Sequence, residues 1–267
     1  MTHRFRSYAA IGDSFAEGLG DLHASGAPRG WADLVAQGLA AATTQQVSYV
    51  NLAIRGKLLS PLLDEQLAPA LALKPDLLSI SGGNNDVIRP RVSIQANTAR
   101  LKAAIDQAAD AGTHVLFVTV ANMTHQLPLG RLIQIRGDRY AHGVQAWQHH
   151  DHVTVVDNWF DTAFHDPQFW AADKLHLNTR GHYRVATKVL TALNVTAPTW
   201  PEQHLPPTET PSSRTHFVQH VIPWIGRRLR GRSSGDGRPP KQGTLLPVDP
   251  TAASPDRGGP ATEAPTS

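Results

Sequence analysis

Three side chains suited to acyl transfer lie far apart in the sequence, one near residue 14 and two near residue 175. Ser14 lies in "GDS", directly after the apolar run at residues 8–11, and Asp173 and His176 lie in "DKLH". Acyl transfer needs a nucleophile, a base and a group that orients the base. Ser14 can be the nucleophile and His176 the base, with Asp173 fixing the tautomer of the imidazole. A simpler interpretation of "GDS" is a helix N-cap after a strand.

Donors for the oxyanion of such a reaction follow two further apolar runs. "NLAIRGKLL" contains Gly56, and "SGGNND" contains Asn84 and Asn85. The backbone N–H groups of Ser14 and Gly56, together with the amide of Asn85, can form an oxyanion hole. A glycine suits this role because the backbone must approach the substrate closely. Asn84 is the alternative to Asn85 as the side chain that donates a hydrogen bond to the oxyanion.

The elements that must position these residues alternate between strands and helices. Short apolar runs predict strands at residues 8–11, 47–53, 77–81, 115–120 and 153–156. Helical stretches are predicted at residues 30–42, 61–73, 94–111, 131–150 and 179–193. This alternation predicts a three-layer α/β/α sandwich around a parallel five-stranded sheet. Ligands bind at the carboxyl ends of such strands, which is where the polar residues collect.

The four polar blocks, in this order, resemble those of the SGNH subgroup of the GDSL esterase/lipase family. The blocks are "GDSFAEGLGD", "NLAIRGKLL", "GGNND" and "DKLH". The resemblance covers roughly residues 5–195, and it implies a flavodoxin-like parallel sheet and no metal or organic cofactor. It also implies Ser14 as nucleophile, Gly56 and Asn85 as oxyanion donors with the Ser14 amide, and Asp173 with His176 completing the triad. The Gly-x-Ser-x-Gly elbow of α/β-hydrolases is absent.

Two residues beside these blocks are candidates for substrate contact. Arg55 precedes Gly56 and either receives an anionic or phosphate-bearing substrate or pairs with Glu17 or Asp21. Trp170 lies just upstream of the last block and is a candidate wall for an acyl pocket.

Other histidines are weaker candidates for chemistry. His182 rivals the histidine of the last block as the base, but it follows a glycine and is predicted to lie inside a helix. A group of histidines farther upstream is expected at solvated positions or helix ends rather than on a metal: His142, His149, His150 and His152.

Composition narrows the class of protein. Apolar residues make up 40% of the chain and charged residues 18%, as in globular proteins. There is no cysteine, which excludes disulfides, thiolate metal sites and a cysteine nucleophile. The first residues do not resemble a signal peptide, and no apolar run approaches the length of a membrane helix. We therefore expect a cytoplasmic protein.

The chain divides by composition into four parts. We expect a hydrolase domain at residues 1–197, a Pro/Thr-rich linker at 198–213, a basic amphipathic segment at 214–232 and a disordered tail at 233–267. The basic segment suits an anionic membrane surface, or it docks its apolar side on the domain. No recognition motif accompanies its charge, so no specific nucleic-acid partner is expected.

The sequence thus predicts a serine hydrolase that cleaves a small carboxylic ester through an acyl-enzyme. A short acyl ester on a sugar and a longer lipid or thioester remain open as substrates, as does the oligomeric state. One alternative is a non-catalytic binding module that keeps this fold and uses its basic tail to contact a membrane or a partner. Another is a glycoside- or phosphate-processing enzyme, which needs a metal or a second carboxylate beside Asp173.

Overall fold

A computed structural model describes most of the chain up to residue 201 and a short segment near its end. The described residues are 3–23, 25–127, 130–147, 150–201, 235 and 237–250. The expected linker beyond residue 201 and the whole basic segment at 214–232 lie outside these ranges. In the described part, no helix combines the length and the apolar character needed to cross a bilayer.

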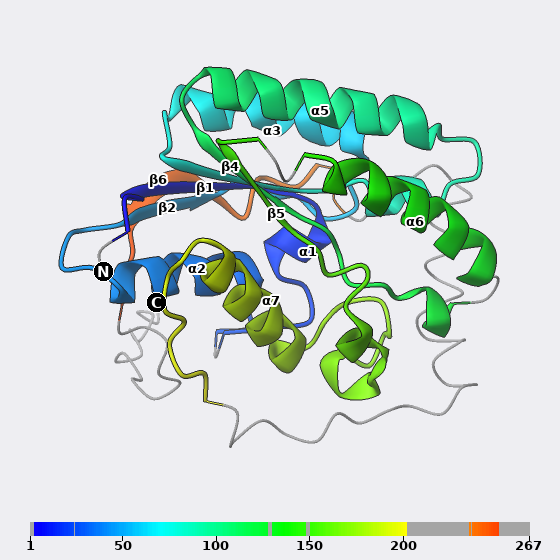
Figure 1. Ribbon diagram of the computed structural model, residues 1–267. Helices are drawn as coiled ribbons and strands as arrows, with labels where there is room; N and C mark the ends of the chain where they lie inside the picture. Colours follow the sequence, from blue (N-terminus) through cyan, green and yellow to red (C-terminus); the bar gives the residue numbers. More distant parts are fainter. Residues whose placement is uncertain are drawn as a thin grey trace, which may run out of the picture.

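One sheet forms the centre of the molecule (Figure 1). Its strand order is β5-β4-β3-β1-β2-β6. The strands are β1 (Ser7–Gly12), β2 (Ser48–Asn51), β3 (Leu77–Ser81), β4 (His114–Val118), β5 (Val153–Val156) and β6 (Gln242–Pro247). The first five pair in parallel, as predicted. All five residues of β3 are buried, which is typical of a sheet covered on both faces.

The sheet has six strands, so the prediction of five was wrong. The additional strand, β6, pairs antiparallel with β2 at the edge of the sheet, and Tyr49 lies opposite Leu246. It comes from residues 233–267, for which disorder was predicted, and that prediction is wrong for β6. Most residues of β6 are exposed. An edge strand is held by backbone hydrogen bonds rather than by a core, so its composition resembles that of an unstructured tail.

Helices cover both faces of the sheet, as expected for three layers (Figure 1). One core contains residues of α2 (Gly30–Ala41) and α7 (Thr179–Ala192). The other contains residues of α3 (Leu59–Ala72), α5 (Ile94–Asp110) and α6 (Gly130–Gln145). The strands therefore need apolar side chains on both faces, which explains why they appear in the sequence as almost continuous apolar runs.

Two very short helices begin where neighbouring strands end. α1 (Ser14–Glu17) follows β1, and α4 (Asn84–Val87) follows β3. The chain goes from β1 to β2 on one side and later returns to place β3 on the other side. This reversal of strand order is the point at which open α/β sheets bind ligands. The reversal brings the first residues of α1 and α4 together at the carboxyl ends of β1 and β3.

The loop between α1 and α2 passes very close to itself. Gly18 and Gly30 both have positive φ, at 94° and 82°, and a Cβ on Gly30 would lie 2.2 Å from the Gly18 Cα. The buried carboxylate of Asp21 closes the same loop by accepting hydrogen bonds from the Gly30 N–H and from the Arg29 guanidinium. This close approach of Gly18 and Gly30 therefore fixes α1 against α2.

We expect Gly30→Ala to destabilise the protein by about 2 kcal/mol or more, because it adds a backbone clash to an unfavourable φ. The melting temperature would fall by about 4–8 °C in a thermal scan. Gly26→Ala is the matched control, since Gly26 also has positive φ, at 80°, but has nothing within 4 Å of a Cβ. It should cost about 1 kcal/mol. Equal losses of stability in both variants would contradict the importance of the close approach of Gly18 and Gly30.

Candidate active site

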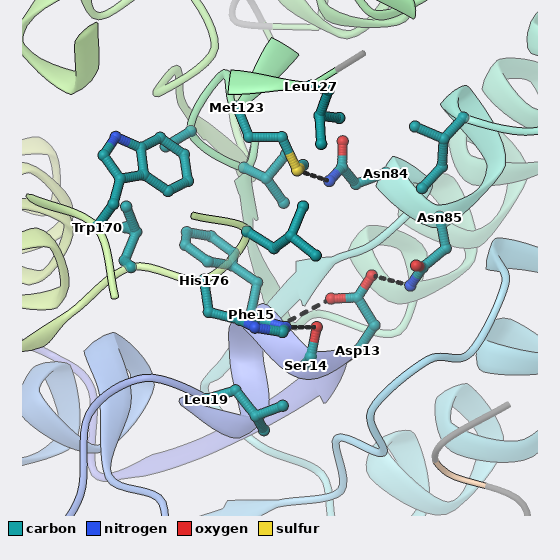
Figure 2. A pocket seen from close by; sticks show the side chains of 15 residues that line it. Asp13, Ser14, Phe15, Leu19, Asn84, Asn85, Met123, Leu127, Trp170 and His176 are labelled. Atoms are coloured by element: carbon teal, nitrogen blue, oxygen red, sulfur yellow. Dashed lines mark hydrogen bonds between the residues drawn. The ribbon is translucent and has the colours of Figure 1, made fainter. Parts of the chain in front are cut away.

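Ser14 is the first residue of α1, and the residue before it caps the helix. The Asp13 carboxylate accepts a hydrogen bond from the Phe15 N–H at 3.0 Å. The capping interpretation of "GDS" therefore applies to Asp13, and it leaves the Ser14 hydroxyl available. The Ser14 Oγ lies 3.2 Å from the His176 Nε2 (Figure 2).

His176 is held from its other side by Asp173. The His176 Nδ1 lies 2.6 Å from the Asp173 Oδ2. The second carboxylate oxygen accepts the backbone N–H groups of Leu175 and His176, both at 3.0 Å. Burial would raise the pKa of Asp173, but these bonds and the charge of His176 outweigh it and lower the pKa to about 2. A carboxylate that is ionised at neutral pH can hold the proton of the imidazole on Nδ1.

The two asparagines of α4 both line the same pocket (Figure 2). The Asn85 Nδ2 donates to the Asp13 Oδ2 at 3.0 Å and to the Lys57 backbone oxygen at 3.1 Å. The Asn84 Nδ2 lies 3.9 Å from the Met123 sulfur, which is a weak acceptor. The structure thus joins Asn85, but not Asn84, to the residue that precedes Ser14.

Neither Gly56 nor Arg55 is among the residues that line this pocket. Gly56 has a φ of 75°, and the next residue, Lys57, provides the backbone oxygen that binds Asn85. The Arg55 guanidinium forms an ion pair with Glu17, and the Arg55 N–H donates to the same carboxylate at 2.7 Å. Of the two alternatives for Arg55, the structure contains the pair with Glu17.

The pocket next to Ser14 is small and largely apolar. Its volume is about 70 Å³, and it is partly open to solvent; a single water needs about 10–15 Å³ on the same scale. Trp170 forms part of its wall and is held by a hydrogen bond from its indole N–H to the Phe164 backbone oxygen at 2.7 Å. The apolar lining residues are Phe15, Leu19, Ile88, Val120, Ala121, Met123, Leu127, Trp170, Leu175 and Leu177.

His182, the rival base, lies inside α7 and is fully buried. Its Nδ1 accepts the Trp31 N–H at 3.0 Å, and its Nε2 lies 3.1 Å from the Leu19 backbone oxygen. Burial lowers the pKa of His182 to about 4. With both ring nitrogens bonded to backbone, its structural role is to tie α7 to α2 and to the loop after α1.

Asp13 contributes more to the site than its sequence position suggests. Its carboxylate joins the start of α1 to Asn85 and is almost fully buried. Burial raises the pKa of Asp13 to about 6 and the charge of Asp86 adds to this, while the bonds from Phe15 and Asn85 and the charge of His176 partly offset it. In the sequence, its place between a buried strand and the serine indicated only a helix N-cap.

We predict a pH-dependent difference in stability between the wild type and Asp13→Asn. Because the pKa of Asp13 is higher in the folded protein than in the unfolded chain, the folded state binds this proton more tightly. Wild-type stability relative to the variant, which cannot titrate here, should fall by about 2 kcal/mol as pH rises from 4 to 7. Urea unfolding of both proteins at several pH values measures this. A difference independent of pH would contradict it.

Comparisons with known proteins agree with this architecture. A lipase from a goat rumen metagenome superposes with a TM-score of 0.59 at 16% identity, covering 70% of this chain and 96% of its own. An acetylxylan esterase from Geobacillus stearothermophilus superposes with a TM-score of 0.59 at 21% identity, covering 74% of this chain and 99% of its own. At these identities the likeness establishes the fold. No curated protein sequence matches the chain.

The sequence also matches one protein family. The model of the GDSL-like Lipase/Acylhydrolase family matches residues 10–184, which include every residue of the candidate site. The match spans more than half of the chain, and the chain therefore belongs to this family of ester hydrolases.

Proposed function

We propose that the protein hydrolyses small carboxylic esters through an acyl-enzyme formed on Ser14. The observation that carries this proposal is the continuous series of contacts from the Ser14 Oγ to the His176 Nε2 at 3.2 Å, and from the His176 Nδ1 to the Asp173 Oδ2 at 2.6 Å. A nucleophile in contact with a base that is itself oriented by a third group is the arrangement that acyl transfer needs.

The first half of the reaction forms the acyl-enzyme. His176 takes the proton of the Ser14 hydroxyl as the Oγ attacks the ester carbonyl carbon. The oxyanion is stabilised by the backbone N–H groups of Ser14 and Gly56 and by one N–H of Asn85, which leaves its bond to Asp13 or Lys57. His176 then donates its proton to the leaving alkoxide as the carbon–oxygen bond breaks, releasing the alcohol. Asp173 stabilises the imidazolium throughout.

The second half regenerates the enzyme. His176 takes a proton from a water, which attacks the acyl carbon. The bond to the Ser14 Oγ then breaks, and the proton returns to the serine as the carboxylic acid leaves. Each oxyanion donor is expected to contribute about 100- to 1000-fold to turnover.

We expect Ser14→Ala to lower the kcat for p-nitrophenyl acetate at least about 1000-fold and to abolish labelling by a fluorophosphonate, because the nucleophile is lost. The readouts are the release of p-nitrophenol and the mass of the labelled protein. Ser25→Ala, in an exposed loop, is the matched control and should behave as wild type. Equal rates in the wild type and Ser14→Ala would contradict the proposed nucleophile. An inactive, unlabelled wild type would favour the non-catalytic binding module.

The size of the pocket supports a short acyl group as the substrate class. A pocket of about 70 Å³ holds only a handful of non-hydrogen atoms, and Trp170 forms part of its wall. Trp170 is 2% exposed, and its indole is fixed by the bond to the Phe164 backbone oxygen, so an acyl chain that extends through this wall has to displace a packed ring. An acetyl to butyryl ester fits this space.

We therefore expect kcat/KM for p-nitrophenyl esters to be highest between acetate and butyrate and to fall at least about tenfold by octanoate. Trp170→Ala should raise the ratio of octanoate to acetate activity, because it opens the pocket wall. Trp147→Ala, just after α6 and outside this pocket, is the matched control and should leave the ratio unchanged. A wild type that prefers octanoate or palmitate would contradict the short-acyl assignment.

A further inference from the structure

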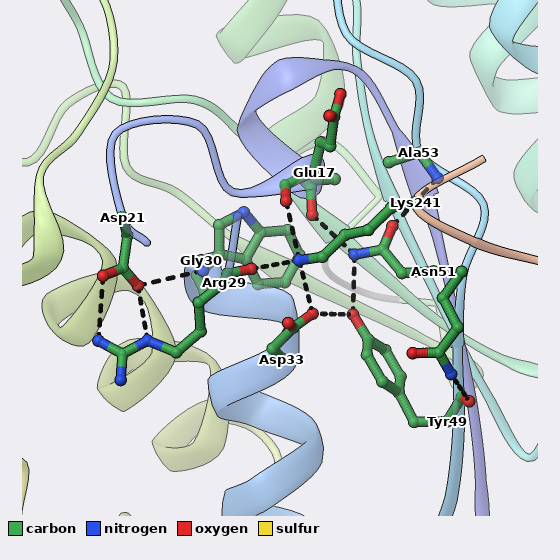
Figure 3. Close-up of polar contacts among 12 residues, drawn as sticks. Glu17, Asp21, Arg29, Gly30, Asp33, Tyr49, Asn51, Ala53 and Lys241 are labelled. Carbon is green, nitrogen blue, oxygen red and sulfur yellow. Dashed lines mark hydrogen bonds and ion pairs between the residues drawn. The ribbon is translucent and has the colours of Figure 1, made fainter. Parts of the chain in front are cut away.

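A largely buried cation from the far end of the chain, Lys241, lies against the helix that carries Ser14. Lys241 directly precedes β6, and its side chain is 13% exposed. The Lys241 Nζ donates to the Glu17 backbone oxygen at 2.8 Å, to the Asp33 Oδ1 at 2.9 Å and to the Arg29 backbone oxygen (Figure 3). Glu17 is the last residue of α1, and Ser14 is the first.

The contacts of Lys241 satisfy groups that would otherwise be costly to bury. The last carbonyls of a helix have no partner within it and carry partial negative charge. In α1, the Asn51 Nδ2 binds the Ala16 oxygen at 2.9 Å, and Lys241 binds the Glu17 oxygen. A buried ammonium needs a charged partner, and Asp33 supplies one. The end of α1 is thereby held by two side chains from outside the helix.

The same C-terminal segment also touches the loop that contains Gly56. Gly235 packs so closely on Arg55 that a Cβ would lie 2.0 Å from the Arg55 backbone oxygen. The Lys241 N–H donates to the Ala53 backbone oxygen at 3.3 Å. Arg55 is in turn joined to α1 through the carboxylate of Glu17. One segment therefore contacts both the helix of the nucleophile and the loop of a proposed oxyanion donor.

We propose that Lys241 is a positioning residue for catalysis, which holds α1 and the Arg55–Gly56 loop in the relative placement that acyl transfer requires. This inference rests on the proposed function, since it assigns Lys241 a role in placing the Ser14 Oγ against His176 and the Gly56 N–H. Lys241 lies outside the residues matched by the family model, 10–184, so the family match does not include it.

The expected effect is kinetic, because reacting groups displaced by about 1 Å lose up to about 100-fold in rate. Without its cation, the Glu17 oxygen and the Asp33 carboxylate lose a partner, and α1 can shift. Substrate still fits a pocket to which Lys241 contributes no lining atom. The turnover of correctly folded sites should therefore fall while KM stays nearly unchanged.

The test compares Lys241→Met with Arg238→Met in the full chain. Arg238 is exposed in the same segment, so its substitution removes the same charge without the buried contacts. Active sites are counted by fluorophosphonate labelling, and kcat and KM for p-nitrophenyl acetate are measured per labelled site. We expect kcat per site to fall at least about tenfold in Lys241→Met, with KM within about twofold of wild type, and Arg238→Met to behave as wild type.

A chemical rescue uses the absence of cysteine from the chain. Lys241→Cys can be alkylated in urea with bromoethylamine, which restores a side chain of lysine length and charge, and then refolded. The aminoethylated protein should regain most of the kcat per site that unmodified Lys241→Cys lacks. Comparing the modified and unmodified Lys241→Cys proteins also tests the positioning role if Lys241→Met does not fold.

Two results would overturn the positioning role. One is fewer labelled sites with wild-type kcat per site, which would mean that Lys241 only stabilises the fold. The other is an equal loss in Arg238→Met, which would point to the charge of the segment in general. Failure of the proposed function is distinguishable from both, because it appears as an inactive and unlabelled wild-type protein.

Discussion

The buried carboxylate of Asp13 connects the parts on which the rest of the site depends. One of its oxygens caps α1 through the Phe15 N–H, and the other binds the amide of Asn85 at the start of α4. The two helices follow strands that are neighbours in the sheet but are separated by about 70 residues of chain. A carboxylate this deeply buried resists ionisation, and the hydrogen bonds from both helices partly compensate for that cost.

Further ion pairs between a buried carboxylate and a partly buried arginine surround this centre and fix the direction of each segment. Asp21 pairs with Arg29 in the loop after α1, and Glu17 pairs with Arg55 in the loop after β2. Such pairs contribute little net stability, because desolvation of the charges offsets their attraction. Breaking one of them is costly, however, since a buried charge is left alone. They therefore favour one arrangement of the loops over alternatives that apolar packing would tolerate.

The predictions from the sequence were most accurate where the pattern reflects burial. The five parallel strands and the large helices between them appear as apolar runs and helical periodicity, because a sheet covered on both faces needs continuous apolar strands. Strand β6 was missed because an exposed edge strand is held by backbone hydrogen bonds, which any composition can provide. Nothing in the sequence singles out Lys241, since a sequence does not show what a charge is buried against.

The sequence by itself determined the order of the elements and the residue types at the end of each strand, including Ser14 and the Asp173–His176 pair. These follow from local patterns, because strand, turn and short spacing are properties of neighbouring residues. The partner of each polar group, in contrast, depends on the folded arrangement: Glu17 for Arg55, Asp13 for Asn85 and the end of α1 for Lys241. Partners far apart in the chain meet only when the sheet forms, since strand order and edge pairing set their distances.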